Sequence, residues 1–383
     1  MAALKNIKRW FWWHRWSSLV CTLFLLMLCL TGLPLIFADE LDGWLNPTHY
    51  ADLPKNMPVA DLDKMLATAR QHYPKQLVTF VVVDDDEPQV LVTMAPSWEP
   101  LDPLRHSLQF DQRTGRLLND EPPAAQKPKT FIDTMLDLHE GMFLDLPGEL
   151  FLGLIGILFV ISIVSGIWLY GPFMKKLDFG TVRLERSLRL KWLDLHNLLG
   201  IATAAWLLVV GITGVMNELS TPLFGIWQMT DVKAVLARYK GRTYADQRQL
   251  GSVEAAYRAA QAAQPAMRVT SIVYPGNPFG SPYHYLCWAK GKEPFSSRLF
   301  SPSLIDPATG KLVAIVKMPV YLRALEVSRP LHFGDYGGMP LKVLWALFDV
   351  VAIIVLVSGV YLWLVRRKFY EDYFKRIEQE ATA

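Results

Sequence analysis

The sequence lacks several features that would assign it to common classes of protein. Only three cysteines occur in 383 residues, and Cys21 and Cys29 fall within one apolar run, so no disulfide framework is implied. The net charge of +3 comes from a few basic clusters and gives no reason to expect a nucleic-acid partner. No Gly-x-Gly-x-x-Gly sequence follows a predicted strand, so no nucleotide-binding loop is expected.

Hydrophobic residues make up 51% of the whole chain. Four long stretches of it contain almost no charged residues. Each stretch is long enough to cross about 30 Å of hydrocarbon as a helix. Asp349 is the single acidic or basic residue inside them. The sequence therefore predicts an integral membrane protein with four spans, bounded by these residues: Arg15 and Asp39, Glu149 and Lys175, Asp194 and Glu218, Lys342 and Arg366.

Basic residues flank these spans on one side. They are Lys5, Lys8, Arg9 and Arg15 before the first span, Lys175, Lys176, Arg183, Arg186, Arg189 and Lys191 between the second and third, and Arg366, Arg367 and Lys368 after the fourth. By the positive-inside rule, both termini and the short link are cytoplasmic and the two long loops lie outside. We expect the first apolar run to be retained as a span, because it is of full span length without an evident cleavage site.

The two outer loops resemble each other in the order of their predicted elements. The first has a helix around 61–72, a strand over 77–83 and the turn sequence Asp111 to Gly115; the second has a helix over 253–263, a strand over 269–273 and the turn Asp306 to Gly310. Asp-x-x-Thr-Gly is a turn signal, since Asp caps its own backbone and Gly takes a positive φ. The chain is thus predicted to be a duplicated unit, with the four helices packed in a pseudo-two-fold bundle and an α+β domain inserted in each half.

This organisation divides the chain into eight segments. They are a cytoplasmic N-terminus with span 1 (1–38), the first periplasmic domain (39–138), span 2 with its lead-in (139–174), the basic link (175–194), span 3 (195–217), the second periplasmic domain (218–331), span 4 with its lead-in (332–365) and a cytoplasmic tail (366–383).

Four histidines occupy matched places in the two halves. His14 lies 18 residues before Gly32 of Thr31-Gly32, and His196 lies 18 before Gly214 of Thr213-Gly214. His139 lies 27 residues before Gly166 of Ser165-Gly166, and His332 lies 27 before Gly359 of Ser358-Gly359. At about 1.5 Å per residue, Thr31-Gly32 and Thr213-Gly214 fall at the membrane level of His139 and His332. Ser165-Gly166 and Ser358-Gly359 fall at the level of His14 and His196.

Paired imidazoles at two levels, with small residues opposite them, are the arrangement that would hold two porphyrins. We expect His14 with His196 to ligate an inner haem iron and His139 with His332 an outer one, with Gly32, Gly214, Gly166 and Gly359 providing side-chain-free helix surface. The haems would be of b type, because no C-x-x-C-H attachment sequence is present. With both axial positions filled by protein, such haems carry electrons.

Other interpretations stay open for single residues. One histidine at a span boundary is more often an interfacial residue, and small-residue pairs can be plain helix contacts. Two imidazoles leave a zinc or copper site short of ligands, and a proton relay does not require symmetric pairs. Asp349 could transfer protons or accept a hydrogen bond within the bundle. Glu149 and Lys342, at matched repeat positions, could form a structural pair.

The combined pattern resembles the PepSY-associated membrane proteins of bacterial inner membranes. The residues that carry the resemblance are His14-Arg15-Trp16, His196-Asn197-Leu198-Leu199-Gly200, Leu138-His139 and Leu331-His332, Ser165-Gly166-Ile167-Trp168 and Ser358-Gly359-Val360-Tyr361, and the two Asp-x-x-Thr-Gly turns. This resemblance covers nearly the whole chain, and within the family the chain resembles the Fox-type ferric-siderophore reductases.

The resemblance implies an oxidoreductase of the bacterial inner membrane, with two haem b groups, that takes part in iron uptake. Electrons would come from a quinol or a cytoplasmic reductase and would reduce a ferric siderophore in the periplasm, with a hydroxamate type expected. Reduction to Fe(II) weakens binding by hard oxygen ligands and releases the iron. The alternative is a binding or regulatory membrane module without redox activity, since PepSY domains are also associated with peptidase inhibition.

Overall fold

The computed structural model describes residues 2–45, 47–54, 57–84, 86–99, 102–174, 178–239, 247–293 and 296–382. Lys175 and Lys176 of the basic link lie outside the described residues. The chain forms two compact units. The first contains residues 1–44, 130–221 and 328–383, and the second contains residues 45–129 and 222–327.

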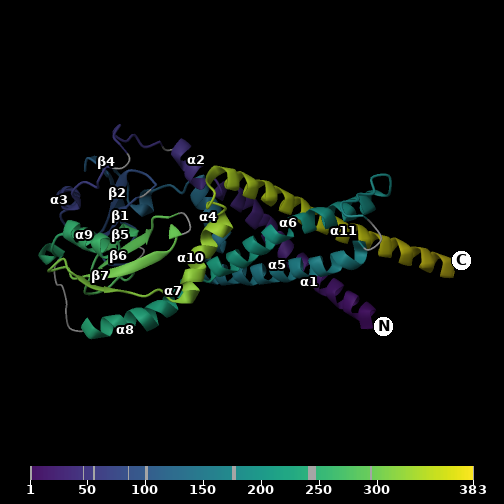
Figure 1. Cartoon of the computed structure of the whole chain (residues 1–383). Coiled ribbons are helices and arrows are strands. Elements are labelled where there is room, and N and C mark those ends of the chain that lie inside the picture. Colours follow the sequence, from purple (N-terminus) through teal and green to yellow (C-terminus); the bar gives the residue numbers. More distant parts are fainter. Residues whose placement is uncertain are drawn as a thin grey trace. The chain divides into compact units, whose positions relative to one another are not determined.

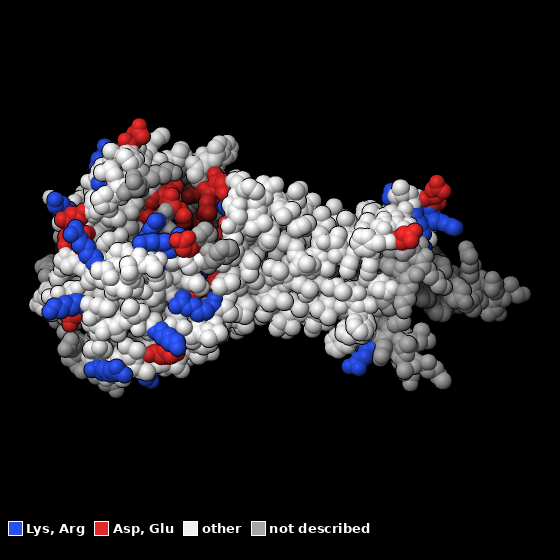
Figure 2. Space-filling model, in the orientation of Figure 1, with Lys and Arg blue, Asp and Glu red and all other residues white. Residues whose placement is uncertain are grey.

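Four long helices dominate the first unit. They are α1 (Ala2–Leu35), α5 (Asp145–Met174), α6 (Leu188–Glu218) and α11 (Gly338–Thr382). Each contains a stretch long and apolar enough to cross a membrane: Arg9–Leu35, Asp145–Gly171, Leu188–Glu218 and Gly338–Val365. The predicted four spans are therefore confirmed, and Figure 2 shows a broad face of these helices without charged side chains.

The four spans form a closed ring in the order α1, α5, α6, α11. Helix α1 packs against α5 and α11, and α6 packs against the same two helices, so α1 lies diagonally opposite α6 (Figure 1). Small buried side chains, including Ser165, Thr203 and Ala204, let the helices approach closely. Residues at equivalent places in α1 and α6 consequently face each other through the centre of the bundle.

His139 and His332 lie on separate short helices rather than on continuous lead-ins to the spans. His139 is in α4 (Phe131–Gly141) and His332 is in α10 (Val320–Phe333). After α4 the chain reverses through Met142 and Phe143, both at positive φ, and a Cβ on Gly148 would lie 1.8 Å from the Gly141 carbonyl oxygen. Gly141 follows His139 by two residues, and Gly334 follows His332 by two residues. Each glycine lies where the short helix is separated from the following span, a separation that the predicted segments did not include.

The eight strands among the described residues of the second unit form one antiparallel sheet, in the order β4-β3-β2-β1-β5-β6-β7-β8. The strands are β1 (Leu77–Val83), β2 (Gln89–Ala95), β3 (His106–Asp111), β4 (Leu117–Asp120), β5 (Met267–Val273), β6 (Tyr285–Gly291), β7 (Phe300–Ile305) and β8 (Leu312–Ile315). Strands β1 and β5 join the two halves through pairs such as Val81 with Ile272. The two expected outer domains thus share one sheet.

The helices α3 (Leu62–His72) and α9 (Val253–Ala263) pack on this sheet and match the two helices predicted from sequence. Their apolar faces join one core with the inward side chains of the strands. Both predicted turns are present, because Asp111 and Asp306 each accept backbone N–H bonds and Gly115 and Gly310 have φ of 70° and 67°. The remaining α-helices are α2 (Ala38–Leu45), α7 (Ser220–Trp227) and α8 (Lys233–Leu236).

The expected pairing of Glu149 with Lys342 is wrong. The buried Lys342 ammonium instead donates to both carboxylate oxygens of Glu40, at 2.8 and 2.9 Å. Glu40 is on α2, which follows span 1 directly, so this ion pair connects the C-terminal end of span 1 with the N-terminal end of span 4. Matched repeat positions did not identify the partner, because the residue equivalent to Glu40 in the second half is the uncharged Pro222.

Candidate functional site

The bundle brings the four matched histidines together in two pairs. The ring centres of His14 and His196 are 6.4 Å apart, with planes at 70°. The ring centres of His139 and His332 are 6.3 Å apart, with planes at 62°. The first pair, called the inner pair below, projects from α1 and α6; the second, the outer pair, projects from α4 and α10.

Each ring of the inner pair is held through its Nδ1 atom by a neighbouring span. His14 Nδ1 lies 2.9 Å from the Ser162 carbonyl oxygen and 3.3 Å from the Ser165 hydroxyl. His196 Nδ1 lies 3.1 Å from the Val355 carbonyl oxygen and 2.9 Å from the Ser358 hydroxyl. The Ser of each Ser-Gly pair therefore contacts an imidazole directly.

The outer pair repeats this arrangement with threonine. His139 Nδ1 lies 2.9 Å from the Thr31 hydroxyl, and His332 Nδ1 lies 3.1 Å from the Val210 carbonyl oxygen and 3.3 Å from the Thr213 hydroxyl. Four helix-borne hydroxyls thus bond four imidazoles, one for each small-residue pair noted in the sequence.

These hydrogen bonds fix the imidazole tautomers. Ser165, Ser358, Thr31 and Thr213 each direct their hydroxyl proton to a carbonyl of their own helix. The hydroxyl oxygen is then left to accept a proton from the histidine, and a carbonyl can only accept. All four rings therefore carry hydrogen on Nδ1 and present the lone pair of Nε2, which is the form that binds a metal.

The glycine of each small-residue pair makes room for the imidazole ring. A Cβ would lie 3.0 Å from the Cε1 of His14 if added at Gly166, and 3.1 Å from that of His139 or His332 if added at Gly32 or Gly214. At Gly359 the distance to His196 would be 3.4 Å, an ordinary contact. The structure therefore places all four glycines against the imidazoles, whereas the sequence suggested contact with the faces and edges of a bound porphyrin.

Burial keeps the outer pair uncharged at neutral pH. Burial and the adjacent His332 lower the pKa of His139 to about 4. Burial also lowers the pKa of His332, although the hydrogen bond that its Nδ1–H donates to the Val210 carbonyl acts in the opposite direction. Neutral imidazoles are the ligand-competent form, so no proton has to be displaced before a metal binds.

A cavity of about 290 Å³ surrounds the inner pair. Its walls come from all four spans, and the residues lining it correspond between the two halves, for example Gly166 with Gly359 and Leu169 with Leu362. Most of the lining is apolar, as in sites for flat organic cofactors. The imidazoles are thus the central polar groups of a largely apolar chamber.

No group of three or more His, Cys, Asp or Glu side chains is placed to hold a metal ion within the described parts of the chain. Each histidine pair on its own supplies only two ligands. A ligand that brings its own additional donors to the metal therefore fits these pairs better than a bare ion does.

Three charged contacts near the pairs were not recognised from sequence. Asp194 is buried two residues before His196, where it accepts a two-pronged hydrogen bond from the Arg183 guanidinium at 2.9 and 2.7 Å. This bond ties the basic link to the start of α6 and raises the pKa of Arg183. At the outer end, Glu149 interacts electrostatically with Glu140 and Glu218, so it lies among carboxylates.

Asp349 is buried on α11 and forms a side-chain hydrogen bond with Cys29 of α1. Its Oδ2 atom has no hydrogen-bond partner among the residues that the structure describes. The bond to Cys29 agrees with the packing role considered for this residue. Proton transfer by Asp349 stays a prediction.

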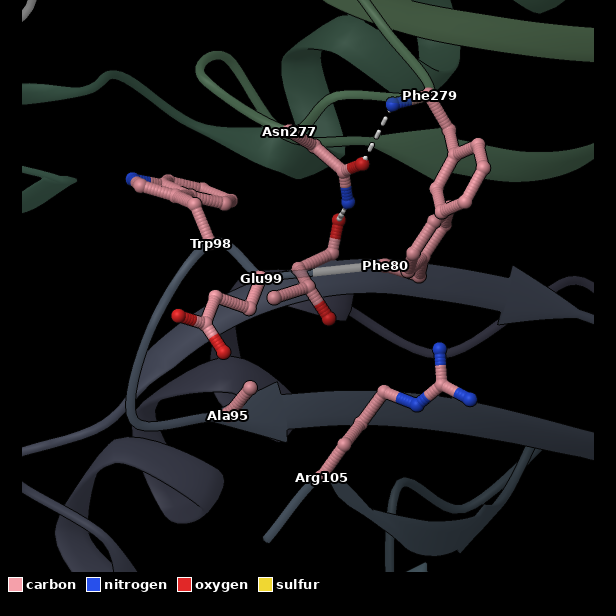
Figure 3. Close-up of a pocket in the computed structure, with 8 residues that line it drawn as sticks. Phe80, Ala95, Trp98, Glu99, Arg105, Asn277 and Phe279 are labelled. Atoms are coloured by element: carbon pink, nitrogen blue, oxygen red, sulfur yellow. Dashed lines mark hydrogen bonds between the residues drawn. The ribbon is translucent and has the colours of Figure 1, made fainter. Parts of the chain in front are cut away.

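The second unit contains a small pocket beside β1, shown in Figure 3. Asn277 closes one side by donating to the Thr79 carbonyl and accepting from the Phe279 backbone N–H, and Trp98 lies over Gly276. The volume of about 10 Å³ suits one water molecule. This pocket is far too small for a chelated iron complex.

Comparison with known proteins gives the family. The family of PepSY-associated TM regions matches residues 11–366, so the chain belongs to it. An uncharacterized protein of Pseudomonas aeruginosa is 26% identical over 272 residues, which cover 66% of this chain and 68% of the relative. The family match over residues 11–366 includes all four matched histidines and the strands β1 to β8.

Proposed function

We propose that this membrane protein carries electrons across the bilayer with two haem b groups. His14 and His196 would hold one haem, and His139 and His332 would hold the other. The observation that carries this proposal is the spacing of both pairs, whose ring centres are 6.4 and 6.3 Å apart. In both pairs, Nδ1 is engaged and Nε2 is left for a metal.

This spacing fits a six-coordinate iron between the rings. A metal–imidazole bond of about 2 Å, with about 1.1 Å more from nitrogen to ring centre, gives roughly 6 Å between the two ring centres. A porphyrin supplies the four donors that each pair lacks. The apolar cavity at the inner pair also fits such a macrocycle.

Haem held by two imidazoles supplies one-electron redox chemistry without an open position for oxygen. The residues of this chain would hold and tune it. Hydrogen bonds from Nδ1 to Ser, Thr and carbonyl oxygens make the imidazoles more basic, and the glycines let the rings approach their anchoring helices. Two sites in one bundle divide a long electron path into shorter steps.

The physiological substrate that we propose is a ferric siderophore outside the membrane, with hydroxamate chelates as the expected class. An electron donor such as a quinol or a cytoplasmic reductase would act at the inner pair, in a bacterial inner membrane with both chain termini in the cytoplasm. Support comes from the basic flanks of the spans and from the resemblance to Fox-type reductases. Reduction of Fe(III) lowers its affinity for hard oxygen ligands and would release the metal.

The visible spectrum of the detergent-purified chain tests the proposal. We expect sharp low-spin bands on reduction with dithionite and about two haems per chain in a pyridine haemochrome assay. His196→Ala and His332→Ala should each reduce the count to about one, while replacement of the exposed His72 by Ala should leave two. Reduction of a ferric hydroxamate by the dithionite-reduced protein is the following assay.

Protein from haem-replete cells that shows no Soret band would contradict the electron-transfer proposal. In that case, the alternative is a PepSY-type binding or regulatory module, in which the eight-stranded sheet would be the active part. If the protein binds haem but does not reduce ferric hydroxamates, the electron-carrier proposal stands and the proposal that a ferric siderophore is the acceptor is contradicted.

A further inference from the structure

The cavity at the inner pair is nearly symmetric, and its few departures from symmetry are informative. Residues at equivalent repeat positions line it on both sides, so that Leu25 corresponds to Leu207, and Leu169 to Leu362. A cavity of this kind presents similar surfaces to both faces of a flat ligand. Any residue that differs between the halves can therefore orient the ligand.

Five lining positions differ in polarity between the halves; at three of them, Ser18, Thr22 and Ser162 correspond to Gly200, Ala204 and Val355. The other two positions carry long side chains. Arg15 on α1 corresponds to Asn197 on α6, and Tyr170 on α5 corresponds to Trp363 on α11. All four residues line the cavity. One half therefore contributes a cation and a hydroxyl, and the other contributes a neutral amide and an indole. Arg189 also lines the cavity, but it is exposed, so water screens its charge.

Arg15 and Tyr170 each have a buried donor without a partner. The Arg15 Nε and the Tyr170 hydroxyl are both inaccessible to solvent and make no hydrogen bond to the described part of the chain. A buried donor that stays unsatisfied destabilises the folded protein, because it has lost its hydrogen bonds to water. Two such atoms among the residues that line one cavity indicate that a ligand with an acceptor group belongs there.

The chemistry of these donors selects the acceptor. The Arg15 guanidinium lies over the Trp16 ring, 5.2 Å from its centre, which leaves its N–H groups to bond in their own plane. A guanidinium bonds carboxylates with two parallel N–H groups and keeps its charge at any physiological pH. A phenol hydroxyl adds one further donor to the same anion.

We infer that Arg15 and Tyr170 bind a carboxylate side chain of the inner haem and so set the orientation of the porphyrin between His14 and His196. This inference rests on the proposed function. Haem b has two carboxylates on one edge of the ring, and the asymmetry of the cavity gives them unequal partners. The carboxylate at Arg15 pairs with a guanidinium cation, whereas the repeat-equivalent side offers Asn197 and Trp363.

The experiment compares haem with its dimethyl ester, in which both carboxylates are uncharged. The full-length chain with His139→Ala, which leaves only the inner pair intact, is produced under haem limitation and titrated with each compound by Soret absorbance. We expect haem to bind roughly ten- to hundredfold more tightly than the ester. Arg15→Asn should remove most of this preference, and Tyr170→Phe should reduce it by about threefold.

A double variant keeps the test independent of folding defects. In Arg15→Asn with Asn197→Arg, the cation moves to the equivalent position of the other half and should restore the preference for the free acid. Arg15→Lys should retain part of it, because the charge stays but the planar fork is lost.

The outcomes separate this inference from the proposed function. If neither compound produces a Soret band, the haem proposal fails. If both bind equally well, or if Arg15→Asn keeps the full preference, the haem proposal stands and the assignment of Arg15 and Tyr170 is overturned.

Discussion

The inner and outer histidine pairs have nearly the same ring separation but are built from different elements. His14 and His196 project from membrane-spanning helices, each of which continues beyond the histidine in both directions. His139 and His332 project from short helices that end two residues and one residue later, respectively. The comparison shows that the distance between two imidazole rings and the stability of the helices that carry them are separate properties. Variants can therefore change one without the other.

The largest effect is expected from filling the space that a glycine leaves for an imidazole. Gly166→Leu would drive a side chain into His14 and Gly32→Leu would drive one into His139, since even a Cβ would approach within 3.0 or 3.1 Å. Each variant should lose its own haem and retain the other, so that the count falls from about two to about one. Gly171→Leu is the control, because a Cβ at Gly171 meets no atom within 4 Å.

A count of two haems in Gly166→Leu would mean that His14 does not occupy this contact when haem is bound. Within the inner pair, the smaller change Gly359→Ala should be tolerated better than Gly166→Ala, because its contact with His196 is 3.4 Å. The fraction of low-spin haem in the absorbance spectrum measures this difference.

The next effect concerns the hydroxyl groups that hold Nδ1. Thr31→Val removes the hydroxyl bonded to His139 at 2.9 Å, and we expect outer haem affinity to fall about 10- to 100-fold. Ser165→Ala should act less on the inner haem, because His14 keeps its 2.9 Å bond to the Ser162 carbonyl. The rate at which Thr31→Val and Ser165→Ala transfer haem to apomyoglobin measures the loss of haem from each variant.

Thr203→Val provides a control on α6. The Thr203 hydroxyl is buried and donates at 2.7 Å to the Leu199 carbonyl of its own helix. Equal rates of haem loss in Thr31→Val and Thr203→Val would show that the Thr31 hydroxyl does not support His139.

A smaller effect should distinguish the short helix α4 from the spans. Thr130 caps α4 in a capping box with Asp133, so Thr130→Ala should cost about 1 kcal/mol of helix stability and weaken the outer haem severalfold. Ser187 begins α6 without a side-chain cap bond, so Ser187→Ala should leave the inner haem unchanged. The rate of haem dissociation from each variant measures these effects. Faster loss of the inner haem from Thr130→Ala would show that the helices carrying the two pairs are not independent.

The smallest effect concerns the ion pair that joins spans 1 and 4. Burial acts to raise the pKa of Glu40, but the hydrogen bond from Lys342 outweighs it and holds this pKa below its usual value. The stabilisation is therefore present above pH 4.5 and is lost as the pH falls through the lowered value. Glu40→Gln should lower the unfolding temperature by a few degrees at pH 7, with an effect of about 1 kcal/mol.

Acidification should make Glu40→Gln and the unmodified protein converge in thermal stability. Asp39→Asn serves as the control, because Asp39 is 95% exposed and lies 3.8 Å from Lys342. A difference between Glu40→Gln and the unmodified chain that persists at low pH would assign the stabilisation to packing instead of charge.

Much of the fold could be predicted because it depends on local sequence. Span length and apolarity identified all four membrane helices, and the Asp-x-x-Thr-Gly turns were predicted at both places where they occur. The equal spacing of histidines and small-residue pairs correctly predicted their common levels, since the rise of a helix converts sequence distance into height. The break between each outer histidine and its span was missed, although Gly141 and Gly334 were available as signals.

The sequence by itself determined the membrane class, the duplicated order of elements and the identity of the four matched histidines, because these follow from periodicity and spacing along one chain. Only the tertiary structure decided that Lys342 pairs with Glu40, that β1 and β5 join eight strands into one sheet, and that Arg15 and Tyr170 share a cavity. Such contacts join residues far apart in sequence. Their formation depends on how helices and strands pack, which no local pattern specifies.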